Sequence, residues 1–239
     1  MLLFLLLPLT SIAANLDSTD RNKIQRIEFS LAYGALIPTG EYTSQSNINS
    51  AFAKNGVDLN LELRYRLSEF IGIGIEKGFF QNFVHTSYFD NRLGQYSNYE
   101  SAEPSTFNSY WSGSYNLIGI NFCNSINKFT IGATINCGII SVEEPYLEYI
   151  WVSPTTILNR FYSQSDNAEG WCLKFKAMIR YNCNKRIDFF IQSSYFFAKP
   201  KINQTNQIII NGNETEIKTS FLQPISNFGI SAGILIKLF

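Results

Sequence analysis

The chain has 239 residues, with 19 Lys and Arg, 19 Asp and Glu and a single His, so its formal net charge is zero. A neutral chain has no long-range field that would attract nucleic acid, and we expect no such partner. Charged residues make up only 16% of the chain and aromatic residues 15%. The near-neutral mean hydropathy excludes a bundle of apolar membrane helices, but not a membrane β-barrel, because half of each barrel strand is polar.

The first residues read "MLLFLLLPLTSIAAN". An apolar run from Leu2 to Leu9 precedes two small residues, Ala13 and Ala14, in the position that signal peptidase prefers. This pattern predicts a secretory signal peptide over residues 1–14. Because the usual Lys or Arg at the front is missing, a buried strand or a short anchor remains the alternative. Residues 25–239 are expected to form one domain.

The stretch "VDLNLELRYRL", Val57–Leu67, alternates apolar and polar residues almost without error. A period of two predicts a β-strand with one apolar and one charged face. In a soluble sheet the charged face would meet water, whereas in a membrane barrel the apolar face meets lipid and the charges point inward.

The same alternation predicts eight strands, each near the length that crosses a membrane obliquely. They span Arg26–Ile37, Val57–Leu67, Ile71–Phe80, Ser114–Asn124, Lys128–Ile140, Gly170–Asn182, Ile187–Phe197 and Ile225–Phe239.

The connections between these strands alternate in length. Three are short, at Ser68–Glu69, around Ser125–Asn127 and around Asn182–Lys185. The other four, near residues 38–55, 81–113, 141–169 and 198–224, are long and polar, and "NQIIING" in the last one suggests a hairpin arm above the membrane. This sorting predicts an all-β fold, an eight-stranded antiparallel up-and-down transmembrane β-barrel with short periplasmic turns and long extracellular loops.

The faces opposite the apolar ones combine glycines with charges of both signs. An exposed glycine-rich face would form a poor strand, but small residues fit opposite large ones inside a narrow barrel. We therefore predict an interior polar network that closes the barrel, since unpaired buried charges would be costly. Its members are Arg26, Glu28, Asp58, Glu62, Arg64, Arg66, Glu76, Lys174, Lys176, Arg180 and Asp188, with Lys237. On this basis Leu61→Arg should block membrane assembly, and Asn60→Ser should be nearly silent.

Aromatic residues gather near the predicted strand ends, which predicts two interfacial girdles on the outer wall. The turn-side set is Phe70, Phe122, Phe129, Tyr181 and Phe189, and the loop-side set is Phe79, Tyr115, Trp171, Tyr195 and Phe197. Lys77 falls on the outward face, which requires a place near the interface or a bulge.

The four cysteines, Cys123, Cys137, Cys172 and Cys183, lack the spacing of a metal site, and we expect no metal and no cofactor. Strand parity places Cys137 outward and Cys172 inward on neighbouring strands, so a direct bridge between them would need a bulge. The three carboxylates of "EEPYLEY", Glu143–Tyr149, could bind a divalent cation in the third long loop, but they do not have the spacing of a calcium loop.

The only His lies in "VHTSYF". His85 and Ser87 resemble the His-x-Ser pair of outer-membrane lipid A deacylases, and Glu100 or Glu103 could orient the base. Tripeptides of this kind arise often by chance, so we expect a solvated loop His, no catalytic residues and no enzyme.

With these strands, its sorted loops and the C-terminal "GISAGILIKLF", the chain over residues 25–239 resembles the small outer-membrane β-barrel proteins of Gram-negative bacteria, of the OmpA-like eight-stranded type found widely in the Bacteroidetes. The resemblance implies an integral outer-membrane location, contact with membrane lipid and lipopolysaccharide, and assembly by the barrel-assembly machinery, with Phe239 as its signal. It implies no activity.

The leading hypothesis is a non-enzymatic outer-membrane anchor with a plugged interior, whose extracellular loops contact a protein partner or another surface, or support envelope integrity. One alternative is an accessory subunit of an outer-membrane secretion or transport complex. Others are a conduit for small hydrophobic ligands and a deacylase-like enzyme.

Overall fold

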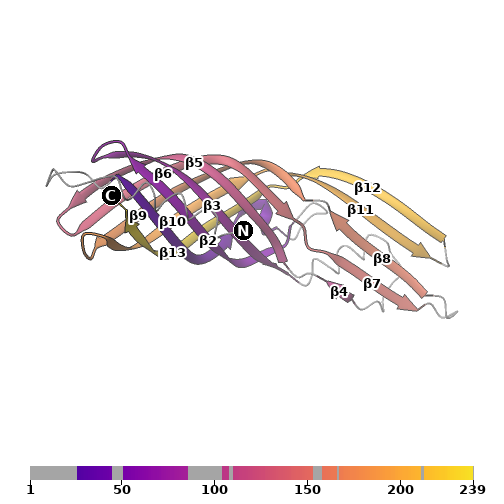
Figure 1. Cartoon of the computed structure of the whole chain (residues 1–239). Coiled ribbons are helices and arrows are strands. Elements are labelled where there is room, and N and C mark those ends of the chain that lie inside the picture. Colours follow the sequence, from indigo (N-terminus) through magenta and orange to yellow (C-terminus); the bar gives the residue numbers. More distant parts are fainter. Residues whose placement is uncertain are drawn as a thin grey trace.

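Eight long strands close into a barrel in the computed structural model, which describes residues 26–44, 51–85, 104–107, 110–152, 158–165, 167–210 and 213–238 (Figure 1). They are β1 (Ile27–Pro38), β2 (Ala53–Arg66), β3 (Ile71–Val84), β5 (Tyr110–Ile126), β6 (Phe129–Glu143), β9 (Ala168–Asn182), β10 (Ile187–Ala198) and β13 (Ile225–Lys237). Neighbours in the barrel are antiparallel and follow chain order, and β1 pairs with β13 to close the ring. The predicted fold class is confirmed.

The short turns lie where the sequence predicts them, and side chains of turn residues fix two of them. Ser68 Oγ accepts hydrogen bonds from the backbone N–H groups of Phe70 and Ile71 between β2 and β3. Asn184 Oδ1 accepts two such bonds, at 2.8 Å each, between β9 and β10. Between β5 and β6, Asn127 has a φ of 56°, a conformation that Asn tolerates better than most residues.

A second sheet extends the barrel at the other end, where the sequence predicts long loops (Figure 1). Its strands are β4 (Pro104–Phe107), β7 (Leu147–Val152), β8 (Leu158–Ser165), β11 (Lys201–Ile210) and β12 (Asn213–Leu222), in the order β12-β11-β8-β7-β4. The hairpin arm suggested by "NQIIING" is β11, which pairs with β12 in a ten-residue register. The other strands were not anticipated, because their short segments lack regular alternation. A single turn of 3-10 helix, η2 (Gly40–Tyr42), follows β1, and no helix in the described ranges is long and apolar enough to span a membrane.

The two faces of the barrel wall are inverted relative to a soluble protein. Outward side chains such as Ile75, Ile118 and Ile191 are 58%, 60% and 64% exposed, whereas the inward Glu62 and Arg64 are 4% and 5% exposed. A soluble monomer does not expose an apolar surface that surrounds the whole molecule. The wall therefore faces lipid. An even number of antiparallel strands, short turns at one end and long extensions at the other are the architecture of a bacterial outer-membrane barrel, and the chain is an integral protein of the Gram-negative outer membrane.

Aromatic residues flank the lipid-facing wall, with one exception to the predicted girdles. Phe129 and Phe189 are about half exposed at the turn end, and Trp171 is 77% exposed toward the other end. The outward assignment of Tyr115 is wrong, because odd positions of β5 face inward and Tyr115 is 2% exposed. Its ring lies over Gly78, directly opposite on β3, where any Cβ would collide with the ring. Lys77 is partly exposed on the outer wall, with Nζ 5.3 Å from the centre of the Phe79 ring.

Candidate functional site

The interior of the barrel holds the main group of ion-paired and hydrogen-bonded side chains among the described residues. Its turn-side part holds a network of charged and amide side chains together with a small apolar cluster of Ala32, Met178, Phe190 and Leu235, and a larger apolar core lies toward the second sheet. The network arises because inward positions of β2, β3 and β9 carry charges, and strand alternation brings every second residue to the lumen.

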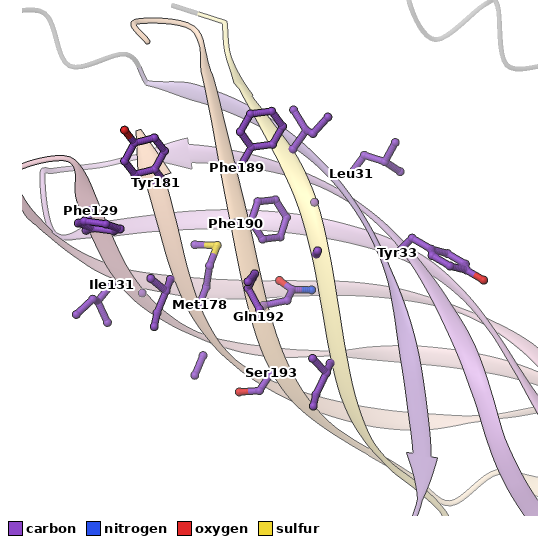
Figure 2. A pocket seen from close by; sticks show the side chains of 18 residues that line it. Leu31, Tyr33, Phe129, Ile131, Met178, Tyr181, Phe189, Phe190, Gln192 and Ser193 are labelled. Carbon is purple, nitrogen blue, oxygen red and sulfur yellow. The ribbon is translucent and has the colours of Figure 1, made fainter. Parts of the chain in front are cut away.

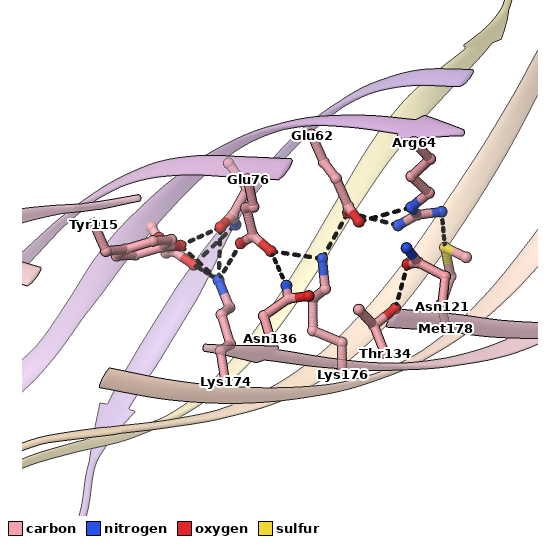
Figure 3. A network of polar contacts seen from close by, with 12 residues as sticks. Glu62, Arg64, Glu76, Tyr115, Asn121, Thr134, Asn136, Lys174, Lys176 and Met178 are labelled. Carbon is pink, nitrogen blue, oxygen red and sulfur yellow. Dashed lines mark hydrogen bonds and ion pairs between the residues drawn. The ribbon is translucent and has the colours of Figure 1, made fainter. Parts of the chain in front are cut away.

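Lys174 is the centre of the part of the network that lies farther from the short turns (Figure 3). Its Nζ lies 3.2 Å from Asp58 Oδ2 and 2.9 Å from Glu76 Oε1, and it donates to Asn60 Oδ1 at 2.6 Å. It also donates to the hydroxyl oxygen of Tyr115 at 2.5 Å, and that hydroxyl donates to Asp58 Oδ1 at 2.9 Å. Because β9 and β2 lie on opposite sides of the barrel, these contacts cross its full width.

One turn-ward step along β9, Lys176 links two carboxylates. Its Nζ lies 2.6 Å from Glu62 Oε2 and 2.7 Å from Glu76 Oε2. Arg64 donates two parallel hydrogen bonds to Glu62, from Nε to Oε1 at 2.8 Å and from Nη2 to Oε2 at 2.7 Å. Asn136 Nδ2 donates to Glu76 Oε2 at 2.6 Å. Figure 3 shows these groups spanning the lumen, so protein atoms fill this section of the barrel axis.

A second group of ion pairs lies nearer the turns. Glu28 Oε1 lies 3.0 Å from Arg66 Nε and 3.1 Å from Arg180 Nη1. Asp188 joins Arg180 Nε at 3.3 Å and Lys237 Nζ at 2.8 Å. A polar cavity of about 570 Å³ opens among these residues and the turns, so this layer reaches the turn-side mouth of the barrel.

Two predictions about individual residues need correction. Arg26 does not join the network: it lies exposed just before β1, and its Nη1 donates to the hydroxyl of Tyr65 at 3.1 Å. Asn60 is 4% exposed and, besides accepting from Lys174, donates from Nδ2 to Asp58 Oδ2 at 2.8 Å. A serine cannot make both bonds, so Asn60→Ser is not expected to be silent.

The apolar core toward the second sheet was not predicted from the sequence. It includes Leu36, Phe80, Ile140, Phe196 and Ala198, all buried at the loop-side ends of their strands. Each of these residues has the parity of an inward position in its strand. The apolar–polar alternation breaks near the strand ends, however, so the sequence does not show there which face of the strand is inward.

The described ends of the connection between β1 and β2, residues 39–44 and 51–52, pack over this apolar core. Trp111, only 1% exposed, donates from Nε1 to the carbonyl of Ala51 at 2.9 Å. Its ring meets Tyr42 of η2 edge-on, with the ring centres 6.0 Å apart. Thr39 and Ser226 also exchange hydrogen bonds, including Thr39 N–H to the Ser226 carbonyl at 2.9 Å. These contacts close the barrel from the side of the second sheet.

The outer wall carries an apolar hollow of about 1060 Å³ over β1, β13, β10, β9 and β6 (Figure 2). It exists because small outward residues, among them Ala177, Ser193 and Ala232, lie between larger ones such as Phe189 and Tyr33. The hollow lies on the outer wall, so it faces away from the lumen.

Some of the other residues singled out from the sequence lie within the described ranges and some lie outside them. The His85 N–H donates to the Phe52 carbonyl at 2.9 Å, whereas Ser87, Glu100 and Glu103 lie outside the described residues. The signal peptide 1–14 and Phe239 lie outside them too. The four cysteines are free, with Cys137 exposed and Cys172 buried on opposite faces as parity predicts.

The acidic segment after β6 binds a neighbouring amide. Glu144 is the second residue of "EEPYLEY" and the first residue after β6. Its carboxylate accepts two hydrogen bonds from Gln204 Nε2, at 3.1 and 3.0 Å. This carboxylate therefore connects the end of β6 to β11, at the junction between barrel and second sheet.

No protein-family model matches the chain, and no curated protein matches its sequence. Among solved structures it is similar to the Neisserial surface protein A, with 9% identity, a TM-score of 0.48 and coverage of 90% of this chain and 97% of that one. It is similar to the outer membrane protein OprG from Pseudomonas aeruginosa, with 10% identity, a TM-score of 0.49 and coverage of 90% and 98%. It is also similar to Ail, the attachment invasion locus protein of Yersinia pestis, with 15% identity, a TM-score of 0.41 and coverage of 88% and 99%. At these identities the likeness concerns the arrangement of strands and not activity.

Proposed function

We propose that the chain is a non-enzymatic membrane anchor that presents the sheet β12-β11-β8-β7-β4, hereafter the surface sheet, outside the cell as an interaction platform. The observation that carries the proposal is the contrast between the two parts. The lumen is filled by a crossed ion-pair network and an apolar core, whereas the strands beyond it continue as an ordered sheet.

The filled lumen argues against transport along the barrel axis. A pore would have to part Lys174 and Lys176 from three carboxylates, and breaking a buried pair costs about 3–5 kcal/mol. Purified protein in planar bilayers is therefore expected to give no stable conductance. Stable single-channel steps would contradict a plugged anchor and favour a conduit.

The proposed display of the surface sheet is tested by labelling from outside the cell. A biotin-acceptor tag between Ile210 and Asn213, at the tip of β11 and β12, should react on intact cells with a reagent that does not cross membranes. The matched control is the same tag between Asn182 and Ile187, in a short turn, which should react only after the outer membrane is permeabilised. The reverse pattern would refute the display.

The same preparation separates the anchor from an accessory subunit. An anchor should elute from mild detergent without another barrel, whereas a subunit of a transport complex would elute with a stoichiometric partner. For assembly, we propose that the barrel-assembly machinery recognises the C-terminal strand with Phe239, and that lipid and lipopolysaccharide surround the wall.

A further inference from the structure

The strand β12 forms an open edge of the surface sheet. It pairs with β11 on one side only and stands at the end of the strand order. All residues from Asn213 to Ser220 are exposed, so nothing in the part of the chain that the structure describes covers them. The pairing with β11 runs through ten residues without a bulge, and the strand contains no Pro. Bulges, prolines and charged side chains are devices that keep an edge from pairing with another chain. The strand β12 has neither a bulge nor a Pro, and its charges, Glu214, Glu216 and Lys218, include both signs.

The charge pattern of β12 matches a second copy of itself. In an antiparallel pair related by a two-fold axis, opposite residues share a face, so the pair must centre on one residue. Centring on Ile217 places Glu216 opposite Lys218 twice, Thr215 opposite Thr219, and Ile217 opposite its own copy. A shift of the centre by one residue, to 216 or 218, sets Glu216 against Glu216 or Lys218 against Lys218. Like charges directly opposite destabilise a pair, so the sequence favours one register.

The existing ion pair supports this register. Lys218 Nζ lies 2.8 Å from Glu216 Oε1 on the same strand, with both side chains well exposed. An exposed pair of this kind contributes little on its own. In the two-fold arrangement each charge gains a second partner of opposite sign, which makes a cluster of four alternating charges on one face of the joined sheet.

The geometry also determines where the second copy must come from. Figure 1 shows the hairpin of β11 and β12 extending from the barrel along the long axis of the molecule, with β12 returning toward the barrel. Antiparallel pairing reverses the second strand and places its barrel at the far end of the joined sheet. The two barrels then lie in two facing membranes.

We propose that β12 pairs with β12 of a second copy in a facing membrane, centred on Ile217, so that the protein makes a homophilic contact between cells. The inference rests on the proposed function, because it requires the surface sheet to lie outside the cell. A single such contact is weak, but many copies on two opposed surfaces act together.

Vesicles that carry the purified protein and one of two dyes test the pairing. Wild-type vesicles should cluster. E216K and K218E should each lower self-clustering at least about tenfold, because two like-charged pairs replace two opposite ones. Vesicles with E216K mixed with vesicles with K218E should cluster again, and the double variant E216K/K218E should cluster with itself.

The matched control is E214K, which makes the same charge change two residues away. In the proposed register Glu214 faces Ser220, so E214K should cluster like wild type. All substituted positions are exposed, and heat-modifiable gel migration confirms that each barrel is folded. Equal clustering of all variants, or failure of the mixed E216K and K218E vesicles to recover, would overturn the pairing.

Cysteine cross-linking tests the register independently. Thr215→Cys in one vesicle population and Thr219→Cys in the other should give a disulfide-linked dimer, while Asn213→Cys with Thr219→Cys should not. The native cysteines lie on the barrel strands and turns, away from β12. If the tag at the tip of β12 is labelled on intact cells but vesicles do not cluster, only the homophilic contact fails. If the tag is not labelled, the proposed function fails as well.

Discussion

At the scale of single residues, the fold depends on how Lys174 and Lys176 are neutralised. Burying a charge without a partner costs several kcal/mol, and here each ammonium group meets at least two carboxylates from opposite walls. Glu76 is the shared partner of both lysines. The lumen is therefore filled by mutually neutralising groups, and removing one lysine takes a partner from two carboxylates.

Lys174→Met tests this dependence. The substitution keeps a long side chain but leaves Asp58 without an ammonium partner and Glu76 with Lys176 alone, and we expect the free energy of unfolding in lipid vesicles to fall by about 3–5 kcal/mol. Lys54→Met, at an exposed position of β2, should change it by less than about 0.5 kcal/mol. Equal stability of the two variants would mean that water reaches the network and relieves the unpaired charges.

At the scale of elements, the barrel is closed at its two ends by different means. The turn-side end is polar and holds a cavity, whereas residues 39–44 and 51–52, at the two ends of the connection between β1 and β2, pack over the loop-side end. Trp111 anchors that segment through the carbonyl of Ala51 and the ring of Tyr42. Because η2 has only three residues, its position depends on these tertiary contacts and not on helix propensity.

Trp111→Ala should release this closure. The lost packing and hydrogen bond are expected to cost about 3–5 kcal/mol and to expose residues 39–44 and 51–52 to added protease, while the barrel wall stays protected. Cleavage in this segment, followed by mass spectrometry, measures the effect. Trp171→Ala is the control, because Trp171 is 77% exposed on the lipid-facing wall and should leave the cleavage pattern unchanged.

At the scale of the whole molecule, the barrel has apolar side chains on its outer wall and charged side chains inside. Its stability therefore depends on an apolar surrounding such as a lipid bilayer. The lipid-facing wall is mainly apolar, with Lys77 of β3 as an exception, and closure leaves no edge within it. The surface sheet differs, because it ends at β12 and does not close. The part in lipid has all its ladder partners, and the part in water keeps an edge for a partner.

Leu61→Arg tests the orientation of the wall. Leu61 lies on the outer face of β2, directly opposite Lys77 on β3, so the new cation enters lipid beside an existing one. Charged residues on the lipid face cost about 2–4 kcal/mol near the bilayer centre and 0–1 near its edges. The fraction of heat-modifiable, folded protein in membranes should drop sharply, whereas Ile126→Arg, at the turn end of β5, should fold nearly as well as wild type.

Much of the fold was determined by the sequence alone. The alternation in Val57–Leu67 and the seven similar segments predicts all eight barrel strands, because a period of two is local and survives any tertiary arrangement. The lengths of the connections predict which end carries the turns. The same alternation, applied strictly, would also have turned Tyr115 inward.

Only the tertiary structure decided which side chains meet. Lys174 finds Asp58 and Glu76 because β9 faces β2 and β3 across the lumen, a distance relation that no local pattern contains. Arg26 leaves the network because it precedes the first paired residue of β1 and reaches an outward tyrosine. The apolar seal and the open edge of β12 likewise depend on strands that pair only after closure. Local periodicity fixes the face that each residue occupies, whereas ring closure and strand stagger fix its neighbours across the barrel.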